Sequence, residues 1–363
     1  MTVREITRYL DSIAPPAYQE SYDNSGLLVG NPDAEIKSVI TCLDVTEEVI
    51  QEAIDKGAGM IVSHHPIIFG GLKRLTGKNY VERTVMMAIK NDIALYAIHT
   101  NLDNVEHGVN ARLSERLGLK DTRILMPKGG MLRKLITFVP TKNVDEVLEA
   151  LFAAGAGHVG AYDECSFRSE GVGTFRGDET TNPHVGEVGK RHSEDESRVE
   201  VILSFDKSSE VLSALKSAHP YEEVAWDMLK LENSLQTVGS GMVGELEEEM
   251  AASDFLAYLQ NIVGGGVRYT QLIKDKVKRI AVCGGSGSFA LGAAISAGAD
   301  VFVTADFKYH QFFDADGQIV IADIGHFESE QFTIDLLYDA IREKFPNFAT
   351  FKTAVNTNPI LYL

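Results

Sequence analysis

The sequence predicts an α/β fold: one split three-layer αβα domain, residues 1–127 plus 235–363, with an inserted ferredoxin-like α+β domain at residues 128–234. Three observations lead to this prediction. In both flanking parts, short apolar runs alternate with amphipathic stretches, which is typical of strands and helices built around a largely parallel sheet. The middle part reads instead as strand, helix, strand, strand, helix, strand. Each flanking part is too short for a comfortable α/β domain, so we expect the two to fold together.

In the first flanking part, apolar residues such as Val3, Ile6 and Leu10 recur at helical spacing. Thr46 is a suitable N-cap, because its side-chain oxygen can accept from the first turn, and Gly118 is a suitable residue to end a helix. The expected elements, in order, are a helix at 2–13, a strand at 37–44, a helix at 46–56, a strand at 60–62, a helix at 81–90, a strand at 93–99 and a helix at 109–117.

The alternation of short apolar runs and amphipathic stretches stops near residues 127–130, and a loop-rich stretch with many hydroxyl and charged residues is expected at 163–198. After about residue 235 the alternation resumes. The expected insert elements are strands at 132–139, 199–205 and 224–231, with helices at 144–153 and 208–218. In the last part we expect helices at 252–263, from the glycine-rich turn at 284–288 to 297, and at 327–344, with strands at 277–283, 300–304 and 318–322.

Composition and charge exclude several classes of protein. The chain has 363 residues, of which 44% are hydrophobic and 24% charged, as in an ordinary globular protein. Its net charge of −18 repels nucleic acid and anionic membrane, so we expect neither as a partner. No apolar run is long enough to span a bilayer.

The cysteines and the first residues point to a reducing compartment. Cys42, Cys165 and Cys283 are few, odd in number and far apart, which argues against a disulfide framework. None lies in a C-x-x-C pair, so no thiolate zinc site is expected. Residues 1–6 lack a secretory pattern, and the cytoplasm is the expected location.

Two adjacent histidines stand where a buried strand ends. The apolar run 60–62 leads into His64 and His65, and Pro66 then ends strand pairing because it has no N–H to donate. Imidazole is the commonest protein ligand for zinc, iron and similar metals. The alternative is that one histidine lies in the core and the other on the surface.

Two more strand ends carry residues that can bind metal. In open α/β sheets, bound ligands lie at the carboxyl ends of the strands. His99 and Asp103 follow one strand, and His326 and Glu330 lie four apart where a helix begins. Each motif is weak alone, but together they provide too many ligands for a zinc ion with three protein ligands and suit two metals that share a carboxylate. The five candidate ligands are His64, His65, Asp103, His326 and Glu330.

Other residues near strand ends are weaker candidates. His99, Asp306 and His310 are candidates for proton transfer or for orienting the ligands, and plain structural packing is the alternative. The turn at 284–288 could hold a phosphate on its backbone N–H groups, but it lacks the usual glycine fingerprints and is equally well explained as a tight connection. Asn24 is a candidate for the wall of a cavity.

These motifs resemble those of the Nif-three-like dinuclear-metal family, whose members are often labelled GTP cyclohydrolase 1 type 2 homologs. The resemblance rests on residues 64–66, 99–103, 304–310 and 323–330, and it covers essentially the whole chain. The insert, with His219-Pro220-Tyr221-Glu222-Glu223, is similar to the PII/CutA-like module of longer bacterial members. We expect residues 221–223 to shape the insert or its contacts between subunits.

The resemblance implies a split α/β domain, a toroidal homohexamer and two divalent metal ions per subunit in a site that faces an internal cavity. The five candidate ligands match the family's ligands, and Glu330 matches the bridging residue. Histidine and carboxylate ligands without cysteine suit zinc, iron or manganese, with cobalt and nickel also compatible. Ala305 stands where many relatives have glycine, and this difference does not touch a ligand.

Two functions follow as hypotheses. The first is a metal-dependent hydrolase of a nucleotide-like or phosphorylated small molecule, which opens the ring of a purine nucleotide such as GTP or cleaves a phosphoester. The alternative is a non-catalytic metal- or ligand-binding regulator in which the PII-like insert acts as the sensor. Because both functions need the same ligand residues, the sequence does not separate them.

Overall fold

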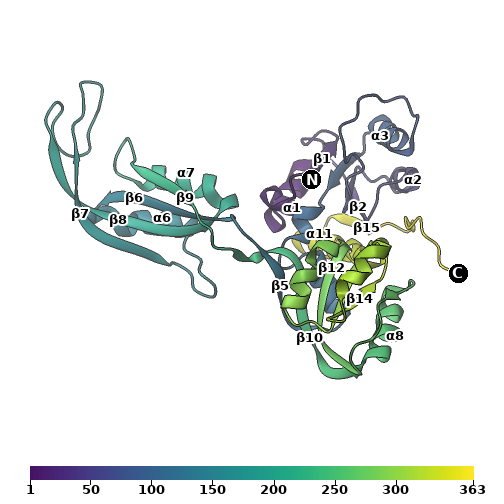
Figure 1. Cartoon of the computed structure of the whole chain (residues 1–363). Helices are drawn as coiled ribbons and strands as arrows, with labels where there is room; N and C mark the ends of the chain where they lie inside the picture. Colours follow the sequence, from purple (N-terminus) through teal and green to yellow (C-terminus); the bar gives the residue numbers. More distant parts are fainter. The chain divides into compact units, whose positions relative to one another are not determined.

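The computed structural model describes residues 1–363, and the chain has a mixed α/β fold that divides into two compact units (Figure 1). Unit 1 joins Met1–Pro127 to Thr237–Leu363, and unit 2 is Lys128–Gln236. None of the helices combines the length and the apolar character that crossing a membrane requires.

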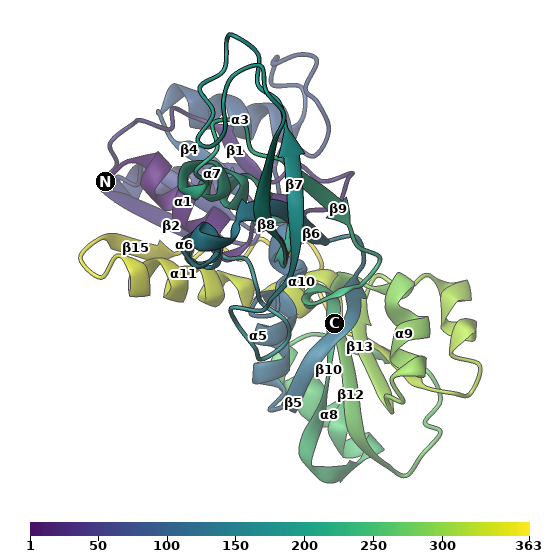
Figure 2. The same cartoon turned by 90° about the vertical axis from the view of Figure 1, so that its left-hand side faces the viewer.

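The first sheet of unit 1 has five strands in the order β1-β4-β3-β2-β15. Four of them run parallel, and β1 lies antiparallel at one edge. Helices α1 and α11 pack on one face and α2 and α3 on the other, through two clusters of buried, mostly aliphatic side chains. Figure 1 labels the four helices, and Figure 2 shows α1, α3 and α11 from another side. The bounds are α1 Val3–Ile13, β1 Gly26–Val29, β2 Ser38–Cys42, α2 Glu47–Lys56, β3 Met60–Ser63, α3 Tyr80–Lys90, β4 Ala94–Ala97, α11 Thr333–Lys344 and β15 Ala349–Lys352.

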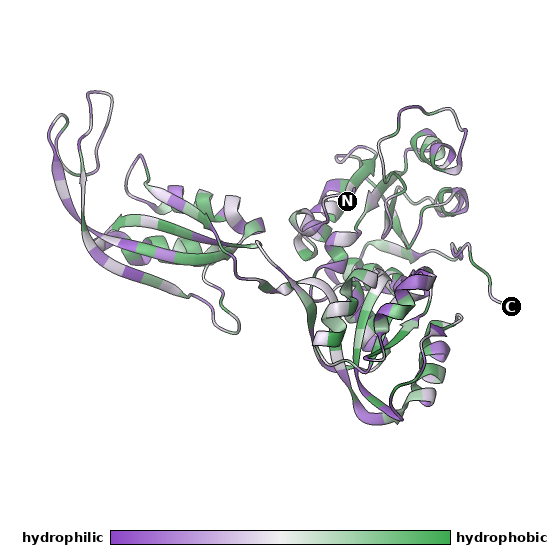
Figure 3. Ribbon diagram, in the orientation of Figure 1, coloured by the Kyte–Doolittle hydropathy of each residue, from purple (hydrophilic) through white to green (hydrophobic).

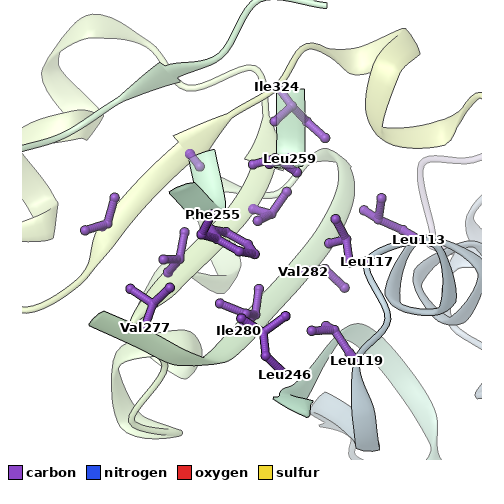
Figure 4. Packing of buried hydrophobic residues seen from close by; sticks show 14 of the residues in the cluster. Leu113, Leu117, Leu119, Leu246, Phe255, Leu259, Val277, Ile280, Val282 and Ile324 are labelled. Carbon is purple, nitrogen blue, oxygen red and sulfur yellow. The ribbon is translucent and has the colours of Figure 1, made fainter. Parts of the chain in front are cut away.

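The second sheet of unit 1 has six strands in the order β11-β14-β13-β12-β10-β5. Its central strands β12, β13 and β14 are parallel. Helices α5 and α8 pack on one face around Phe255 (Figure 4), and α9 packs on the other. The bounds are α4 Thr100–Asp103, α5 Val109–Arg116, β5 Lys120–Lys128, β10 Leu235–Ala251, α8 Ala252–Val263, β11 Arg268–Tyr269, β12 Lys276–Ser286, α9 Leu291–Ser296, β13 Val301–Ala305, β14 Val320–Asp323 and α10 His326–Glu330.

The expected single three-layer domain is therefore corrected, because unit 1 holds two sheets and each lies between helices. Strand β15, from the end of the chain, joins the first sheet, whereas β5, from the first flanking part, joins the second. Alternating strands and helices predict parallel sheets, but alternation alone does not say which strands pair.

Unit 2 has the strand and helix order β6-α6-β7-β8-α7-β9 and an antiparallel sheet in the order β7-β8-β6-β9, which is the ferredoxin-like arrangement. Both helices pack on one face of this sheet through a cluster of buried aliphatic residues. In Figure 3 the helices and strands of this unit carry both hydrophobic green and hydrophilic purple segments. The bounds are β6 Leu132–Pro140, α6 Val144–Ala153, β7 Ser166–Phe175, β8 His192–Ser204, α7 Ser208–Ala218 and β9 Trp226–Lys230.

One strand of unit 2 lies where the sequence predicts a loop. β7 occupies Ser166–Phe175 inside the stretch 163–198, and it pairs along its whole length with β8. Most side chains of β7 are exposed, so the strand shows no apolar alternation in its sequence. Its conformation depends on backbone hydrogen bonds to β8, which a sequence pattern does not reveal.

Candidate metal centre

The two adjacent histidines follow β3 and are still held by the parallel ladder. The backbone N–H groups of His64 and His65 donate to the carbonyl oxygens of Cys42 and Leu43, at 3.2 and 2.9 Å. The regular strand ends at Ser63, so both imidazoles lie at the carboxyl end of the first sheet. There they meet α10, which follows β14 of the second sheet.

His64 and Asp103 point unpaired atoms at each other. The Nδ1–H of His64 donates to the carbonyl oxygen of Ile98 at 2.9 Å, which leaves Nε2 with a lone pair. This Nε2 lies 3.5 Å from Oδ1 of Asp103 and 3.8 Å from Oε2 of Glu330. Neither Nε2 of His64 nor Oδ1 of Asp103 has a hydrogen-bond partner, although both atoms are buried. Buried polar atoms are rarely left unpaired, and two facing lone pairs suit a cation between them.

Glu330 is common to two groups of potential ligands. Its Oε2 lies 2.9 Å from Nε2 of His65 and 3.1 Å from Nε2 of His326. One of these two groups is His65, His326 and Glu330, and the other is His64, Asp103 and Glu330. A third group, His64, His65 and His99, does not include Glu330. In each group the ligand atoms lie within 4.8 Å of one another, so each group could hold a metal ion.

Two aspartates orient the histidines from behind. The Nδ1–H of His65 donates to Asp44 and that of His326 donates to Asp306, both at 2.7 Å, so each Nε2 is directed at Glu330. Carboxylates in this position fix the ring and raise the basicity of a ligating histidine. The sequence pattern points to Asp306 but not to Asp44, whose only signal is its place just after Leu43 and the end of β2, beside β3.

The cluster shifts the pKa values of its members in opposite directions. Burial alone would lower the pKa of His65 and His326, but hydrogen bonds and charges from Glu330, Asp44 and Asp306 raise them to about 10 and about 11. Burial alone would raise the pKa of Glu330, whereas His326 holds it well below its usual range. The positive charges of His65 and His326 thus stabilise the buried carboxylate of Glu330. A divalent cation bound here would stabilise it in the same way.

Asp103 differs from Glu330 in its ionisation. Burial and then the negative charge of Glu330 raise the pKa of Asp103 to about 8. Two neighbouring carboxyl groups therefore do not ionise equally, because like charges at short range repel. A cation between them would favour the charged form of both.

Of the weaker candidates, the structure places His99 beside the cluster, whereas His310 does not reach the cluster and Asn24 does not line the cavity. His99 lies beside the cluster, with its ring 5.2 Å from that of His64, and its Nδ1 bonds Oδ1 of Asp23 at 2.8 Å. His310 is exposed in the short helix Tyr309–Ala315 and contacts the ring of Tyr309, so the structure does not bring it to the cluster. Asn24 donates to the carbonyl oxygen of Ile68 and does not line the cavity.

The glycine-rich turn has a packing role that the sequence analysis did not consider. β12 continues to Ser286, so Gly284 and Gly285 belong to the strand and form no open phosphate loop. A Cβ on Gly285 would stand 2.4 Å from Oε1 of Glu330, and the φ of Gly285 is +62°. Glycine is therefore required here so that the shared carboxylate can lie against the strand. The predicted helix at 327–344 is likewise two helices, α10 and α11, and α10 carries Glu330.

A cavity of about 840 Å³ opens over the cluster and is lined by residues of both sheets of unit 1. Three aromatic side chains on its wall, Tyr22, Phe69 and Phe289, are more than half exposed. Residues 358–360 complete the wall, and the segment is attached by Thr357, whose hydroxyl donates to Asp44 at 2.8 Å. None of these residues is a sequence-predicted candidate, because no local pattern distinguishes them.

If zinc binds to the cluster, Asp44→Asn is expected to weaken its binding about 10- to 100-fold, since the candidate ligand His65 loses its negatively charged partner while the side chain of residue 44 keeps its size. Competition with a chromogenic chelator measures the affinity. Asp55→Asn, an exposed residue that accepts only from Gln51, is the control and should bind zinc as the unmodified chain does. Equal affinity in both variants would show that Asp44 does not support the centre.

Comparison with known proteins places this chain in a family. The model of Duf34/NIF3 (NGG1p interacting factor 3) matches residues 1–359. A Halalkalibacterium halodurans relative named GTP cyclohydrolase 1 type 2 homolog is 37% identical over 357 residues, which cover 96% of each chain. A Bacillus subtilis relative of the same name is 35% identical over 371 residues, which cover 99% of this chain and 98% of that protein.

Solved structures agree with these matches. A Bacillus cereus protein related to NIF3 is 36% identical, with a TM-score of 0.86, over 100% of this chain and 99% of that protein. A Staphylococcus aureus protein is 33% identical, with a TM-score of 0.79 and the same coverage. These matches confirm the resemblance noted in the sequence. With full-length similarity in sequence and in fold, this chain belongs to the Duf34/NIF3 family.

Proposed function

We propose that the chain binds two divalent metal ions in the His/Asp/Glu cluster and uses them to hydrolyse a nucleotide-like or phosphorylated small molecule. The observation that carries the proposal is that Glu330 belongs to two of the three groups of ligand atoms. His65 and His326 would hold one ion and His64 and Asp103 the other. Zinc, iron and manganese suit this set of donors.

The chemistry would be divided between the ions and the chain. Divalent ions at this position supply the Lewis acidity that activates water and polarises a substrate oxygen near neutral pH. His99 stands at the edge of the cavity with Nδ1 engaged by Asp23, which leaves its Nε2 to hold or pass on a proton. Asp44 and Asp306 keep the ligating rings in place.

The walls of the cavity support a substrate that has a ring and a negative charge. Tyr22, Phe69 and Phe289 offer apolar faces on which a planar ring can stack. The side chains at the cluster include carboxylates, so bound metal cations would supply the positive charge that attracts a phosphate there. These features accord with the relatives' name, GTP cyclohydrolase 1 type 2 homolog, and equally with phosphoester cleavage.

The test is metal content and turnover on protein purified without chelator or affinity-tag nickel. We expect about two metal ions per chain and hydrolysis of at least one member of a panel of nucleotides and phosphoesters, lost after chelation and regained with metal. Light scattering on the same sample tests the toroidal homohexamer, which predicts six times the chain mass. No stoichiometric metal after reconstitution with zinc, iron or manganese would refute the dinuclear centre.

A second candidate is a non-catalytic regulator in which unit 2, as a PII/CutA-like sensor, binds a ligand. It is favoured by a separate cavity of about 590 Å³ that lies wholly within unit 2. Two metals per chain with no turnover of any compound in the panel would support this candidate over the hydrolase.

A further inference from the structure

Unit 2 contains a cavity on the face of its sheet that α6 and α7 leave uncovered. Every second residue of β7 lies on this face, which brings Ser169, Gly171 and Gly173 to the cavity. Residues within 176–184 and 221–225 line the other sides. Because glycine has no side chain, the two glycines leave the space above the sheet free. At about 590 Å³ the cavity is of the size that proteins use for small ligands.

Glu196 is the one charged side chain of the lining that is buried, with 9% of its surface exposed. Its Oε1 accepts from the hydroxyl of Tyr221 at 2.8 Å, and it forms no ion pair with any lysine, arginine or histidine. Its Oε2 lies over Gly173, where a Cβ would come within 2.0 Å of it. A buried carboxylate without a cation is costly, so this arrangement favours a cation from outside the chain.

Tyr221 is held in place for its contact with Glu196. Its backbone N–H donates to Nδ1 of His219 at 3.1 Å, and Nε2 of His219 donates to the carbonyl oxygen of Phe138 at 2.9 Å. His219 is buried, and its burial lowers its pKa, so the ring is neutral and both nitrogens are engaged. The segment that the sequence analysis assigned to shaping the insert thus also fixes one wall of the cavity.

The remaining lining is aromatic and carries more negative than positive charge. The rings of Phe138, Phe175 and Tyr221 face the cavity, and the ring centroids of the last two lie 5.9 Å apart. Aromatic faces attract cations through their quadrupole. Of the two arginines in the lining, Arg198 already pairs with Glu200 outside the cavity. Of the four glutamates of the lining, Glu170 accepts from Ser197 on the opposite face of the sheet. Glu196, Glu222 and Glu223 therefore remain at the cavity, together with the second arginine, Arg176.

From this geometry we propose that the cavity of unit 2 is a binding site for an organic cation, an amine attached to an apolar or planar body. The ammonium group lies against Glu196 and the apolar body lies against Phe138, Phe175 and Tyr221. The site is separate from the metal centre, and the proposal rests on neither bound metal nor turnover. It would also give the regulatory candidate a class of ligand.

The experiment titrates the full-length, metal-loaded chain with three probes of matched shape: phenethylamine, 2-phenylethanol and 3-phenylpropanoate. Ligand-detected NMR measures the dissociation constants. We expect saturable binding of phenethylamine, at least tenfold weaker binding of the neutral alcohol and no binding of the anion. Equal or tighter binding of the alcohol or the anion, or no saturable binding of any probe, would overturn the proposal.

Variants locate the site. Glu196→Gln keeps the shape and an acceptor for Tyr221, so it should leave the fold and the binding of the alcohol unchanged while it weakens phenethylamine binding at least tenfold. Asp195→Asn removes the same charge from the neighbouring exposed residue, which is not part of the lining, and should bind phenethylamine normally. Unchanged amine affinity in Glu196→Gln, or equal loss in both variants, would show that attraction to the acidic chain as a whole explains the binding.

Discussion

Glu330→Gln is expected to remove both metal ions and at least 99% of any hydrolysis. Glu330 belongs to two of the three groups of ligand atoms, with Oε2 facing His64, His65 and His326, and the residue is only 2% exposed, so water has little access to replace it. Glutamine has nearly the same shape but offers a neutral carbonyl, which binds a divalent ion far less strongly than a carboxylate does. Elemental analysis measures the metals, and the most active compound of the substrate panel measures turnover.

Glu328→Gln is the matched control for this prediction. Glu328 lies in the same short helix, is 4% exposed and accepts from Asn358 at 2.8 Å, but it belongs to no group of ligand atoms and does not line the cavity. This variant should keep about two metals per chain. Retention of both metals by Glu330→Gln would contradict the shared carboxylate, whereas loss of only one would show that Glu330 serves a single ion.

Phe255→Ala is expected to lower the stability of unit 1 by about 3–5 kcal/mol. Phe255 is fully buried in α8, among aliphatic residues that include Leu259, Val277 and Ile280 (Figure 4). Removal of the ring forfeits its transfer from water and leaves a cavity that the rigid sheet can fill only in part. Such a loss is a large fraction of the 5–15 kcal/mol that is usual for a domain.

The comparison variant is Phe313→Ala, because Phe313 is 67% exposed. Its unfolding free energy should stay within about 0.5 kcal/mol of the unmodified chain. Urea unfolding of the metal-free proteins, followed by circular dichroism, measures both variants, so that metal binding does not add to the apparent stability. Equal midpoints for the two variants would contradict the packing around Phe255.

Local patterns in the sequence place most of the helices and strands of unit 1. β3 and β4 are short apolar runs ended by histidine-containing turns, and every residue of both strands is buried. α2 begins at the expected N-cap, Thr46, whose side chain accepts from Val49. These features depend on neighbours in the chain, which is why the sequence alone determines them. The same patterns predict the strand ends that carry the five candidate ligands.

Tertiary structure alone decides how these pieces meet. The partition into two sheets, with β15 and β5 each joined to the distant part of the chain, depends on hydrogen bonds between remote segments. Asp44 bonds His65, which lies 21 residues away in the sequence, and Asp23 bonds His99, which lies 76 residues away. Gly285 is likewise far from Glu330 in the sequence, although it makes room for that carboxylate in the fold. Likewise, Glu196 becomes buried in a cavity only because β7 and the segment around Tyr221 fold around it. Such contacts join residues with no fixed spacing, because packing and charge act through space and not along the chain.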